Sequence, residues 1–262
     1  MGARYEIDIK MTENNLEQFA RTELMLGKAG LQKLQNSFVV VVGIGAVGGY
    51  AVEGLARAGV GKIRVVDFDE VAISNINRQL LATHSTIGKS KAELARDRVL
   101  DINPNCNVEA VKKFMHVETA DEILAGEPDF VVDAIDSLNP KVELLVACDR
   151  LQLPVISSMG AALRNDFTKI KIGKLAKTYN CPLARRVRKY LKKRNVSMKI
   201  PCIYSTEPVA EKVNESILPD EKSEDNAYDR GRKRRTLGSM PTITGIFGLA
   251  IANYIINTLT ED

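Results

Sequence analysis

An apolar segment that leads directly into a glycine-rich motif constrains the fold of this chain more than any other feature. Phe38–Val42 contains one phenylalanine and four valines, as expected of a parallel strand that is buried on both faces. The next residues, Gly43-Ile44-Gly45-Ala46-Val47-Gly48, match the pattern G-x-G-x-x-G, and residues 46–58 have helical spacing. A strand, a glycine-rich turn and a helix in this order predict the first unit of a nucleotide-binding α/β fold.

The glycines of this motif, Gly43, Gly45 and Gly48, each have an expected physical role. Glycine permits a tight turn and lets the backbone approach a phosphate, and the following helix directs its N–H groups and its dipole at that anion. Asp67 lies nineteen residues after Gly48, at the end of a second predicted strand at 62–67, where a carboxylate can accept hydrogen bonds from ribose hydroxyls. The motif therefore predicts a bound nucleotide. It does not identify a reaction, because NAD-dependent oxidoreductases share it.

Strand and helix patterns alternate as far as residue 158. Further strands are predicted at 108–111, 129–135 and 154–158, and further helices at 16–34, with a break near Gly27 and Gly30, at 89–102 and at 141–151. This alternation predicts an α/β fold with a doubly wound, mostly parallel Rossmann-like sheet. The pattern loosens after residue 164. We therefore expect a single nucleotide-binding domain over residues 1–262, with a basic, partly mobile substrate-binding insertion at 164–240 in its C-terminal half.

Composition excludes several classes of protein. Of the 262 residues, 45% are hydrophobic and 27% are charged, which is typical of a globular protein rather than a disordered one. The four cysteines form no C-x-x-C pair, which argues against a zinc ribbon or a disulfide framework and favours a reducing, cytoplasmic location. Residues 243–259 are mostly apolar but contain two glycines and two asparagines. A core helix accounts for them better than a stable membrane span, and membrane association through this helix is the minor alternative.

The residues that follow Asp67 distinguish between the classes of nucleotide-binding protein. The run Asp67-Phe68-Asp69-Glu70-Val71-Ala72-Ile73-Ser74-Asn75-Ile76-Asn77-Arg78-Gln79 resembles the D-x-D-x-V-x-x-S-N-x-x-R-Q hallmark of the ubiquitin-activating superfamily. That superfamily includes the molybdopterin- and thiamin-pathway adenylyltransferases. Residues 88–92 resemble its G-x-x-K-[AV] motif, residues 133–136 its D-x-x-D motif, and residues 21–27 its N-terminal arginine-containing helix.

This resemblance implies that the chain adenylates a carboxylate, with ATP and Mg²⁺ as cofactors and a monovalent cation as a further candidate. The reaction brings two anions together and expels pyrophosphate, so fixed cations are needed where charge accumulates. By resemblance, Arg78 and Lys91 contact the triphosphate, Asn75 orients it, and Asp136 holds Mg²⁺. Arg21 would reach the phosphates of a partner subunit, which makes the active unit a homodimer. The implied nucleotide-binding set is Gly43, Gly45, Gly48, Asp67, Asp69, Asn75, Arg78, Gln79 and Lys91, and the implied catalytic set is Arg78, Lys91, Asp136 and Arg21.

The C-terminal half carries an unbalanced positive charge. Residues 164–199 contain thirteen lysines or arginines and a single acidic residue, Asp166. Within them, residues 182–194 have the spacing of an amphipathic helix with one strongly basic face. An ordinary solvated face normally mixes both signs of charge, and this one has no acidic residue. We expect its cations to contact the phosphates of a polyanionic substrate, namely Arg185, Arg186, Arg188, Lys189, Lys192 and Lys193.

Residues 166–191 and 202–208 resemble the tRNA threonylcarbamoyladenosine dehydratases, and this resemblance extends from about residue 16 to residue 259. It implies that ATP activates the threonyl carboxylate of a modified adenosine beside the tRNA anticodon, after which ring closure removes water. The six cations of the basic face are then expected to contact the phosphates of this tRNA. Tyr179, Tyr190 and Tyr204 are expected to stack on unpaired bases, although Tyr190 also lies on the apolar stripe of the helix. Sulfur-transfer or electron-transfer proteins are further candidate partners.

Three alternatives are weighed against this hypothesis. Activation of the C-terminus of a small sulfur-carrier protein is disfavoured by the missing zinc motifs and by the basic segment. A noncatalytic tRNA-binding protein would have no need of the acidic and basic residues of the nucleotide site. An oxidoreductase lacks support, because neither His84 nor His116 has a recognisable setting.

The segment Gly88-Lys89-Ser90 does not complete a phosphate-binding P-loop, because Thr83 occupies the position of its first glycine. Cys202 is expected to be a buried structural residue rather than a thioester-forming one.

Overall fold

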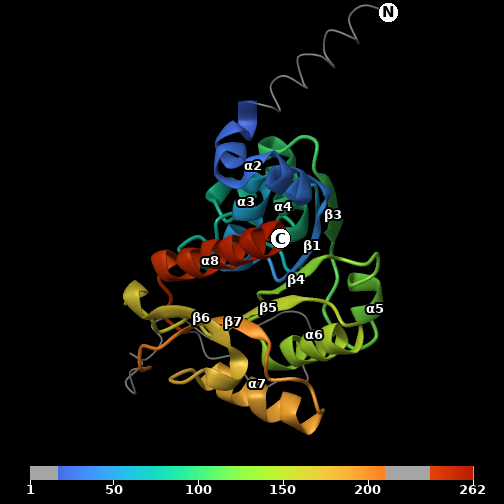
Figure 1. Ribbon diagram of the computed structural model, residues 1–262. Helices are drawn as coiled ribbons and strands as arrows, with labels where there is room; N and C mark the ends of the chain where they lie inside the picture. Colours follow the sequence, from blue (N-terminus) through green and yellow to red (C-terminus); the bar gives the residue numbers. More distant parts are fainter. Residues whose placement is uncertain (1–16, 210–236, 262) are drawn as a thin grey trace, which may run out of the picture.

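The computed structural model describes residues 17–209 and 237–261, which form one seven-stranded sheet with the order β3-β2-β1-β4-β5-β7-β6 (Figure 1). Along the chain, the strands are β1 (Phe38–Val42), β2 (Lys62–Val66), β3 (Asn107–Val111), β4 (Phe130–Asp133), β5 (Val155–Ser158), β6 (Ile170–Lys174) and β7 (Pro201–Ser205). All neighbouring strands are parallel except β6 and β7, which are antiparallel. The predicted doubly wound, mostly parallel sheet is confirmed.

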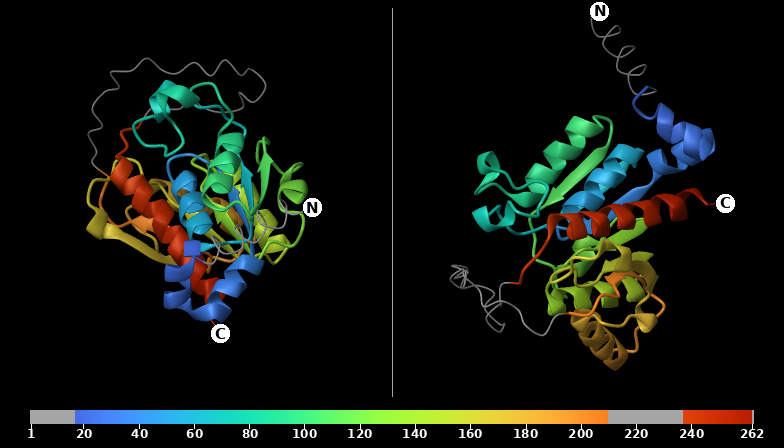
Figure 2. Two further views of the ribbon diagram at one scale, coloured as in Figure 1. Left: turned by 90° about the horizontal axis from the view of Figure 1, so that it is seen from above. Right: turned by 90° about the vertical axis from the view of Figure 1, so that its left-hand side faces the viewer.

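Helices cover both faces of the sheet (Figures 1 and 2). On one face lie α2 (Ala20–Asn36), α3 (Gly48–Ala58), α4 (Lys91–Ile102) and α8 (Pro241–Thr260), and on the other lie α5 (Ala120–Ile123), α6 (Leu138–Arg150) and α7 (Pro182–Lys193). Short 3-10 helices occur at η1 (Ile73–Asn75), η2 (His84–Thr86), η3 (Phe167–Lys169) and η4 (Leu175–Lys177).

Strand β1 lies inside the sheet, between β2 and β4, and belongs to two hydrophobic cores. Val39 and Val41 pack with the helices of the α3 and α8 layer, whereas Val40 and Val42 pack with those of the α6 layer. Successive side chains of a strand point to opposite faces, so a strand with a core on each side must be apolar at every position. This explains why all five residues of β1 are buried.

Helix α8 is long and apolar enough to cross a membrane by length and composition, with a mean hydropathy of 1.4. It nevertheless packs against α3, and Ile243, Phe247, Ile251 and Ile255 follow one face of it into the core. The two helices approach closely, because a Cβ atom on Gly54 would lie 2.7 Å from the Cβ of Ala252. These contacts agree with the expectation of a core helix.

Helix α2 has the predicted break at Gly27, whose backbone is non-helical with φ 72° and ψ 165°, and its second part ends at Asn36. One segment differs from its predicted form. The segment from residue 164 onwards is part of the main sheet, because β7 pairs with β5 and β6 forms the edge beside it. The alternating polar residues of β6 concealed this strand, since an edge strand has one face in water. Residues 210–235, for which we expected mobility, lie outside the described residues.

The carboxyl ends of β1, β2 and β4 share one edge of the sheet. The chain proceeds from β1 to β2 and β3 on one side, whereas β4 and β5 lie on the other side. Ligands of doubly wound folds bind in the crevice where the strand order reverses in this way. The predicted nucleotide-site residues of the glycine-rich motif and of the segments after β2 and β4 all lie here. We call these carboxyl ends of the strands, with the loops that follow them, the nucleotide edge of the sheet.

Candidate active site

The three glycines of the loop between β1 and α3 have different physical roles. Gly43 has a positive φ of 91°, and a Cβ atom on it would lie 2.9 Å from the carbonyl oxygen of Ala134. A Cβ atom on Gly48 would lie 1.8 Å from the carbonyl oxygen of Gly43. At Gly45 the nearest atom to such a Cβ is Nε2 of Gln79, at 3.8 Å, so this position has room for a ligand. The first and third glycines therefore fold the loop, and the second leaves space for a phosphate beside the start of α3.

Asp67 joins the glycine-rich loop to the end of β2. Its Oδ2 accepts a hydrogen bond from the N–H of Ile44 at 2.6 Å, and its Oδ1 accepts one from the N–H of Asp69 at 2.8 Å. Burial raises the pKa of the Asp67 carboxyl, and the positive charge of Lys91 opposes that rise. Each carboxylate oxygen can accept a second hydrogen bond, so this geometry permits the predicted contact with ribose hydroxyls.

Lys91 is the first residue of α4 and is directed at Asp69. Its Nζ lies 2.9 Å from Oδ2 of Asp69, and only 5% of the residue is exposed. The structure thus brings two predicted nucleotide-site residues together as an ion pair. A triphosphate that approaches this edge would compete with Asp69 for the same ammonium group.

The loop after β2 carries the other predicted contacts. Asn75 is buried, and its Oδ1 accepts a hydrogen bond from the N–H of Ala72 at 3.1 Å, so this side chain also holds its own loop. Nη1 of Arg78 donates to the carbonyl oxygen of Ser74 at 2.8 Å and to Oδ1 of Asn77 at 2.7 Å. The guanidinium group is therefore attached to neutral oxygens of its own loop.

Asp136 lies in the exposed turn between β4 and α6, at the same edge of the sheet. Its Oδ1 accepts a hydrogen bond from Oγ of Ser137 at 3.2 Å, and Ser137 rather than Asp136 is the N-cap residue of α6. The residues described include no group of three or more His, Cys, Asp or Glu that could hold a metal. A single exposed carboxylate is suited to Mg²⁺, which is usually held by one or two carboxylates together with substrate phosphates and water.

Arg21 does not lie at this site within its own subunit. The side chain of Gln18, one turn before it, donates a hydrogen bond to the carbonyl oxygen of Ile102 at the end of α4, whereas Lys91 begins that helix. The 12 residues of α4 separate these two ends by about 18 Å. In both views of Figure 2, α2 and the loop that contains η1 and η2 lie at opposite ends of the molecule.

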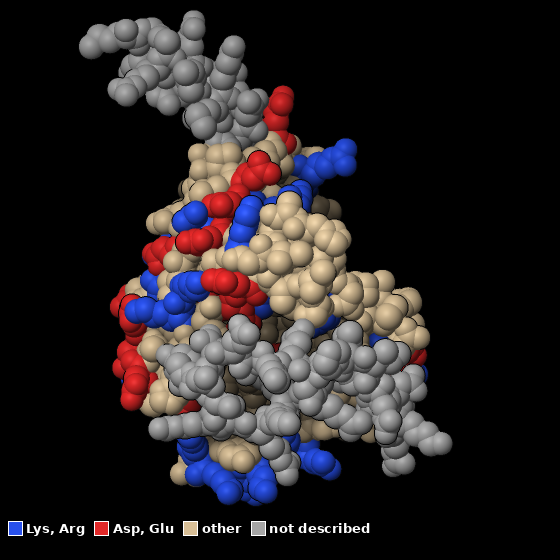
Figure 3. Space-filling view, turned by 180° about the vertical axis from the view of Figure 1, so that it is seen from behind, with Lys and Arg blue, Asp and Glu red and all other residues tan. Residues whose placement is uncertain are grey.

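The basic face of α7 forms a continuous exposed surface. Five of the six predicted cations are exposed, namely Arg185, Arg186, Lys189, Lys192 and Lys193. In Figure 3, lysine and arginine gather at the lower end of the molecule, where α7 lies. We define these five residues as the basic patch. Arg194 is also exposed but forms a bidentate ion pair with Glu143, with both distances 2.7 Å.

Arg188 differs from the five cations of the basic patch. It is partly buried, and its Nη1 donates to the carbonyl oxygen of Thr178 at 2.9 Å, to that of Leu175 at 3.4 Å and to the Thr178 hydroxyl. Its position on the helix directs it at the η4 segment instead of the solvent. These bonds give Arg188 a structural role, and its contact with tRNA stays a prediction.

The aromatic and cysteine predictions have separate outcomes. Tyr204 is only 6% exposed, so it cannot stack on a base, and it packs edge-to-face against Tyr179 instead. Tyr179 and Tyr190 are 52% and 40% exposed.

Cys202 lies in β7, where burial raises the pKa of its thiol to about 12. These properties are those of a structural cysteine.

The burial of Lys141 was not identified from the sequence. Lys141 in α6 is fully buried and forms an ion pair with Asp133 at the end of β4. Its position was the available signal, because Lys141 shares a helical face with Leu144, Leu145 and Cys148, which are all buried. A lysine on an apolar face requires a buried partner.

Comparisons with known proteins agree with this geometry. The sequence model of the ThiF family matches residues 17–262. The chain is 40% identical to the tRNA threonylcarbamoyladenosine dehydratase of Bacillus subtilis over 248 residues, which cover 94% of this chain and 96% of that protein. Crystal structures of the Escherichia coli tRNA N6-threonylcarbamoyladenosine dehydratase in complex with ATP and with AMP are each 30% identical, with a TM-score of 0.80, over 93% of this chain and 94% of theirs.

Proposed function

Because the chain belongs to the ThiF family, we propose that it is an ATP-dependent adenylating enzyme that dehydrates threonylcarbamoyladenosine in tRNA. The observation that carries this proposal is the similarity to the Bacillus subtilis dehydratase, which extends over 94% of the chain. It therefore includes the nucleotide edge of the sheet and the C-terminal half that contains α7. The basic patch supports a polyanionic substrate, because lysine and arginine neutralise phosphates. Activation of a sulfur-carrier protein is not favoured.

The proposed chemistry uses ATP to convert a carboxylate oxygen into a leaving group. The threonyl carboxylate attacks the α-phosphate and pyrophosphate leaves. A nucleophile within the same modified nucleoside then attacks the acyl carbon, and AMP leaves with the former carboxylate oxygen. The net change in the nucleoside is the loss of one water. Arg78 and Lys91 stabilise the charge that develops on the phosphates, and Asp67 binds the ribose.

Mg²⁺ is proposed as the metal cofactor, held by Asp136 together with phosphate oxygens. The exposed carboxylate at the carboxyl end of β4 supports this assignment, since hard cations prefer oxygen ligands. When bound, Mg²⁺ would neutralise phosphate charge during the attack. A monovalent cation and a cytoplasmic location are proposed with it. Sulfur-transfer or electron-transfer partners are proposals that rest on the family resemblance alone.

The active unit is proposed to be a homodimer in which Arg21 serves the site of its partner. Arg21 is exposed on α2, far from the nucleotide edge of its own subunit. Leu24 and Met25 follow it on the same helix and are 87% and 84% exposed. Exposed apolar side chains beside a functional arginine support a protein interface at this end of the molecule.

Removal of three charges from the basic patch should weaken tRNA binding. In the triple variant Arg186→Gln/Lys189→Gln/Lys193→Gln, we expect the affinity for tRNA to fall, and the loss should be largest at low salt, where ions screen the phosphates least. The slope of log affinity against log salt should become shallower by about one unit for each phosphate that the helix no longer neutralises. Affinity for ATP should be unchanged, because the glycine-rich loop and Asp67 are intact. Filter binding over a salt series gives the slope.

A matched triple variant removes the same charge elsewhere. Arg57, Arg96 and Lys113 have side chains that are 57%, 41% and 40% exposed, and all three lie outside α7. Their change to glutamine should leave the salt slope near that of the wild type. Arg188→Gln should lower thermal stability with little effect on the slope. Equal slopes for the patch variant and the wild type would show that α7 does not contact tRNA.

A further inference from the structure

Lys141 and Asp133 form an ion pair from which water is fully excluded. Nζ of Lys141 lies 2.7 Å from Oδ2 of Asp133, and neither side chain has any exposed surface. The ammonium group also donates to the carbonyl oxygen of Ser158 at 2.9 Å, and it lies 3.4 Å from Oγ of Ser157. Three elements thus meet at one charge, namely the end of β4, the end of β5 and the first turn of α6.

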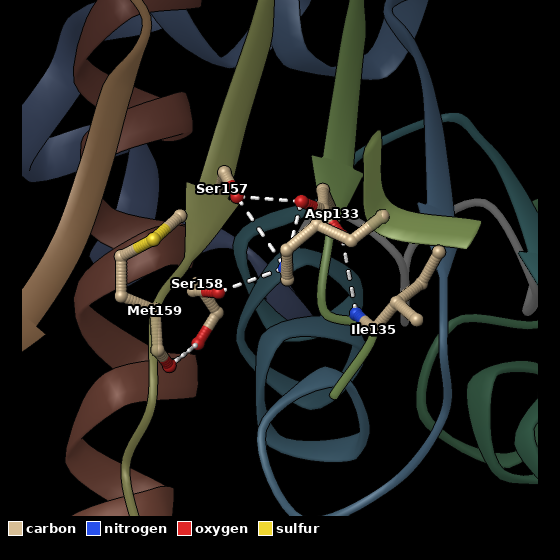
Figure 4. A network of polar contacts seen from close by, with 6 residues as sticks. Asp133, Ile135, Ser157, Ser158 and Met159 are labelled. Carbon is tan, nitrogen blue, oxygen red and sulfur yellow. Dashed lines mark hydrogen bonds and ion pairs between the residues drawn. The ribbon is translucent and has the colours of Figure 1, made fainter. Parts of the chain in front are cut away.

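Asp133 uses both of its carboxylate oxygens. Oδ2 accepts hydrogen bonds from Lys141 and from Oγ of Ser157, the latter at 2.5 Å, and Oδ1 accepts one from the N–H of Ile135 at 3.2 Å. Figure 4 shows Asp133 and Ser157 directed at each other from the ends of neighbouring strands, and Ile135 reached from the opposite side of the carboxylate. The pair therefore connects the sheet to the turn that follows β4.

That turn, residues 134–137, carries Asp136 and contacts the glycine-rich loop. The N–H of Ala134 donates to the carbonyl oxygen of Val42 at 2.9 Å. The Ala134 carbonyl oxygen also lies so close to Gly43 that a Cβ atom there would approach it to 2.9 Å. The turn begins after Asp133 and ends where α6 begins, so the bond between Lys141 and Asp133 closes the turn across its two ends.

An ion pair in the core is not required for stability. Desolvation of two charges costs several kcal/mol, and well-packed apolar residues often replace such pairs without loss. Burial raises the pKa of the Asp133 carboxyl, and the Lys141 ammonium opposes that rise. What the pair provides that apolar side chains would not is a directional connection. Its hydrogen bonds fix the position of one end of the turn relative to the other.

We propose that Lys141 is a positioning residue that acts through Asp133 to hold the 134–137 turn, and with it Asp136, in the geometry that binds the metal of a metal–nucleotide complex. The proposal rests on the proposed function, in which Asp136 holds Mg²⁺. It adds Lys141 and Asp133 to the residues on which metal binding depends, although neither touches the metal or the nucleotide.

The test measures ATP affinity by titration calorimetry with and without Mg²⁺. In the wild type, Mg²⁺ should tighten ATP binding. In Lys141→Met, this Mg²⁺-dependent tightening should be reduced by about tenfold or more, which is the usual effect of removing a residue that orients a metal ligand. Affinity for ATP without Mg²⁺ should change much less, because Asp67 and the loop at Gly45 are untouched.

Leu145→Ala provides the matched control for lost stability. Leu145 lies on the same helix, is fully buried in the same core and makes no polar contact with the turn. This variant should lose thermal stability comparably but keep the Mg²⁺-dependent tightening within about twofold of the wild type. If Lys141→Met and Leu145→Ala show the same Mg²⁺ dependence, Lys141 is merely structural and the proposal is overturned.

The double variant Asp133→Asn/Lys141→Met covers the case in which Lys141→Met does not fold. It leaves no unpaired charge in the core, so it should be more stable than the single variant. Its Mg²⁺-dependent tightening should still be reduced, because the connection between β4 and α6 is missing. Wild-type Mg²⁺ dependence in the double variant would contradict the proposal, as would a wild type whose ATP affinity ignores Mg²⁺. If the enzyme proved unable to modify tRNA, the proposed function would be wrong, but the binding of ATP and Mg²⁺ could still be measured and compared among these variants.

Discussion

Replacement of Arg78 by alanine should lower the rate of ATP–pyrophosphate exchange by about a hundredfold or more, because one of the proposed cations would no longer stabilise the charge that develops on the phosphates. The contacts of Arg78 support this size of effect. Its guanidinium group is bound to the neutral oxygens of Ser74 and Asn77, and the loss of these bonds costs little when a phosphate replaces them. Lys91→Ala should have a similar effect, although Asp69 then loses its partner as well.

Arg57→Ala is the control for this prediction. Arg57 is an exposed arginine on α3 that pairs with Glu53, and it lies in the last turn of that helix. Exchange by this variant should match the wild type. A rate for Arg78→Ala within about threefold of the wild type would show that Arg78 does not stabilise the transition state.

Complementation between two inactive variants tests the subunit arrangement. Arg21→Ala and Asp136→Ala should each be nearly inactive alone, because every site then lacks one functional residue. In the proposed homodimer, subunit exchange gives mixed dimers in which one site has both residues intact. Equal mixing should restore roughly a quarter of the wild-type activity, since half of the dimers are mixed and half of their sites are complete.

The pair Arg78→Ala and Asp136→Ala is the matched control for exchange. Both residues lie at the nucleotide edge of one subunit, so each site of a mixed dimer retains one defect and no activity should return. Recovery in this control pair would contradict the assignment of Arg78 and Asp136 to the same site. Absence of recovery with Arg21→Ala, despite demonstrated subunit exchange, would show that Arg21 does not act across the interface.

Local signals allowed the nucleotide edge of the fold to be predicted from the sequence. The strand at Phe38–Val42, the glycine-rich loop and Asp67 follow each other along the chain, and their spacing alone determines that they meet. The loop that carries Arg78 and the start of α4 at Lys91 could be placed for the same reason. The roles of these residues in catalysis stay predictions.

Properties that depend on distant partners could not be predicted in this way. Lys141 is buried because Asp133 and Ser158 accept its hydrogen bonds, and the backbone of Ser158 is seventeen positions away. Arg188 faces carbonyl groups of η4 rather than solvent, although its neighbours in the sequence are exposed cations. Such differences between adjacent charges depend on packing, which the helical spacing of one segment does not reveal.

The origin of the oxygen in the released AMP tests the central claim most directly. The enzyme is incubated with ATP and a tRNA whose threonylcarbamoyl group carries oxygen-18 in its carboxylate, and the products are analysed by mass spectrometry. Adenylation followed by ring closure predicts a nucleoside lighter by one labelled water and AMP that carries one oxygen-18 atom. Unchanged tRNA, or labelled inorganic phosphate released together with ADP, would contradict this account.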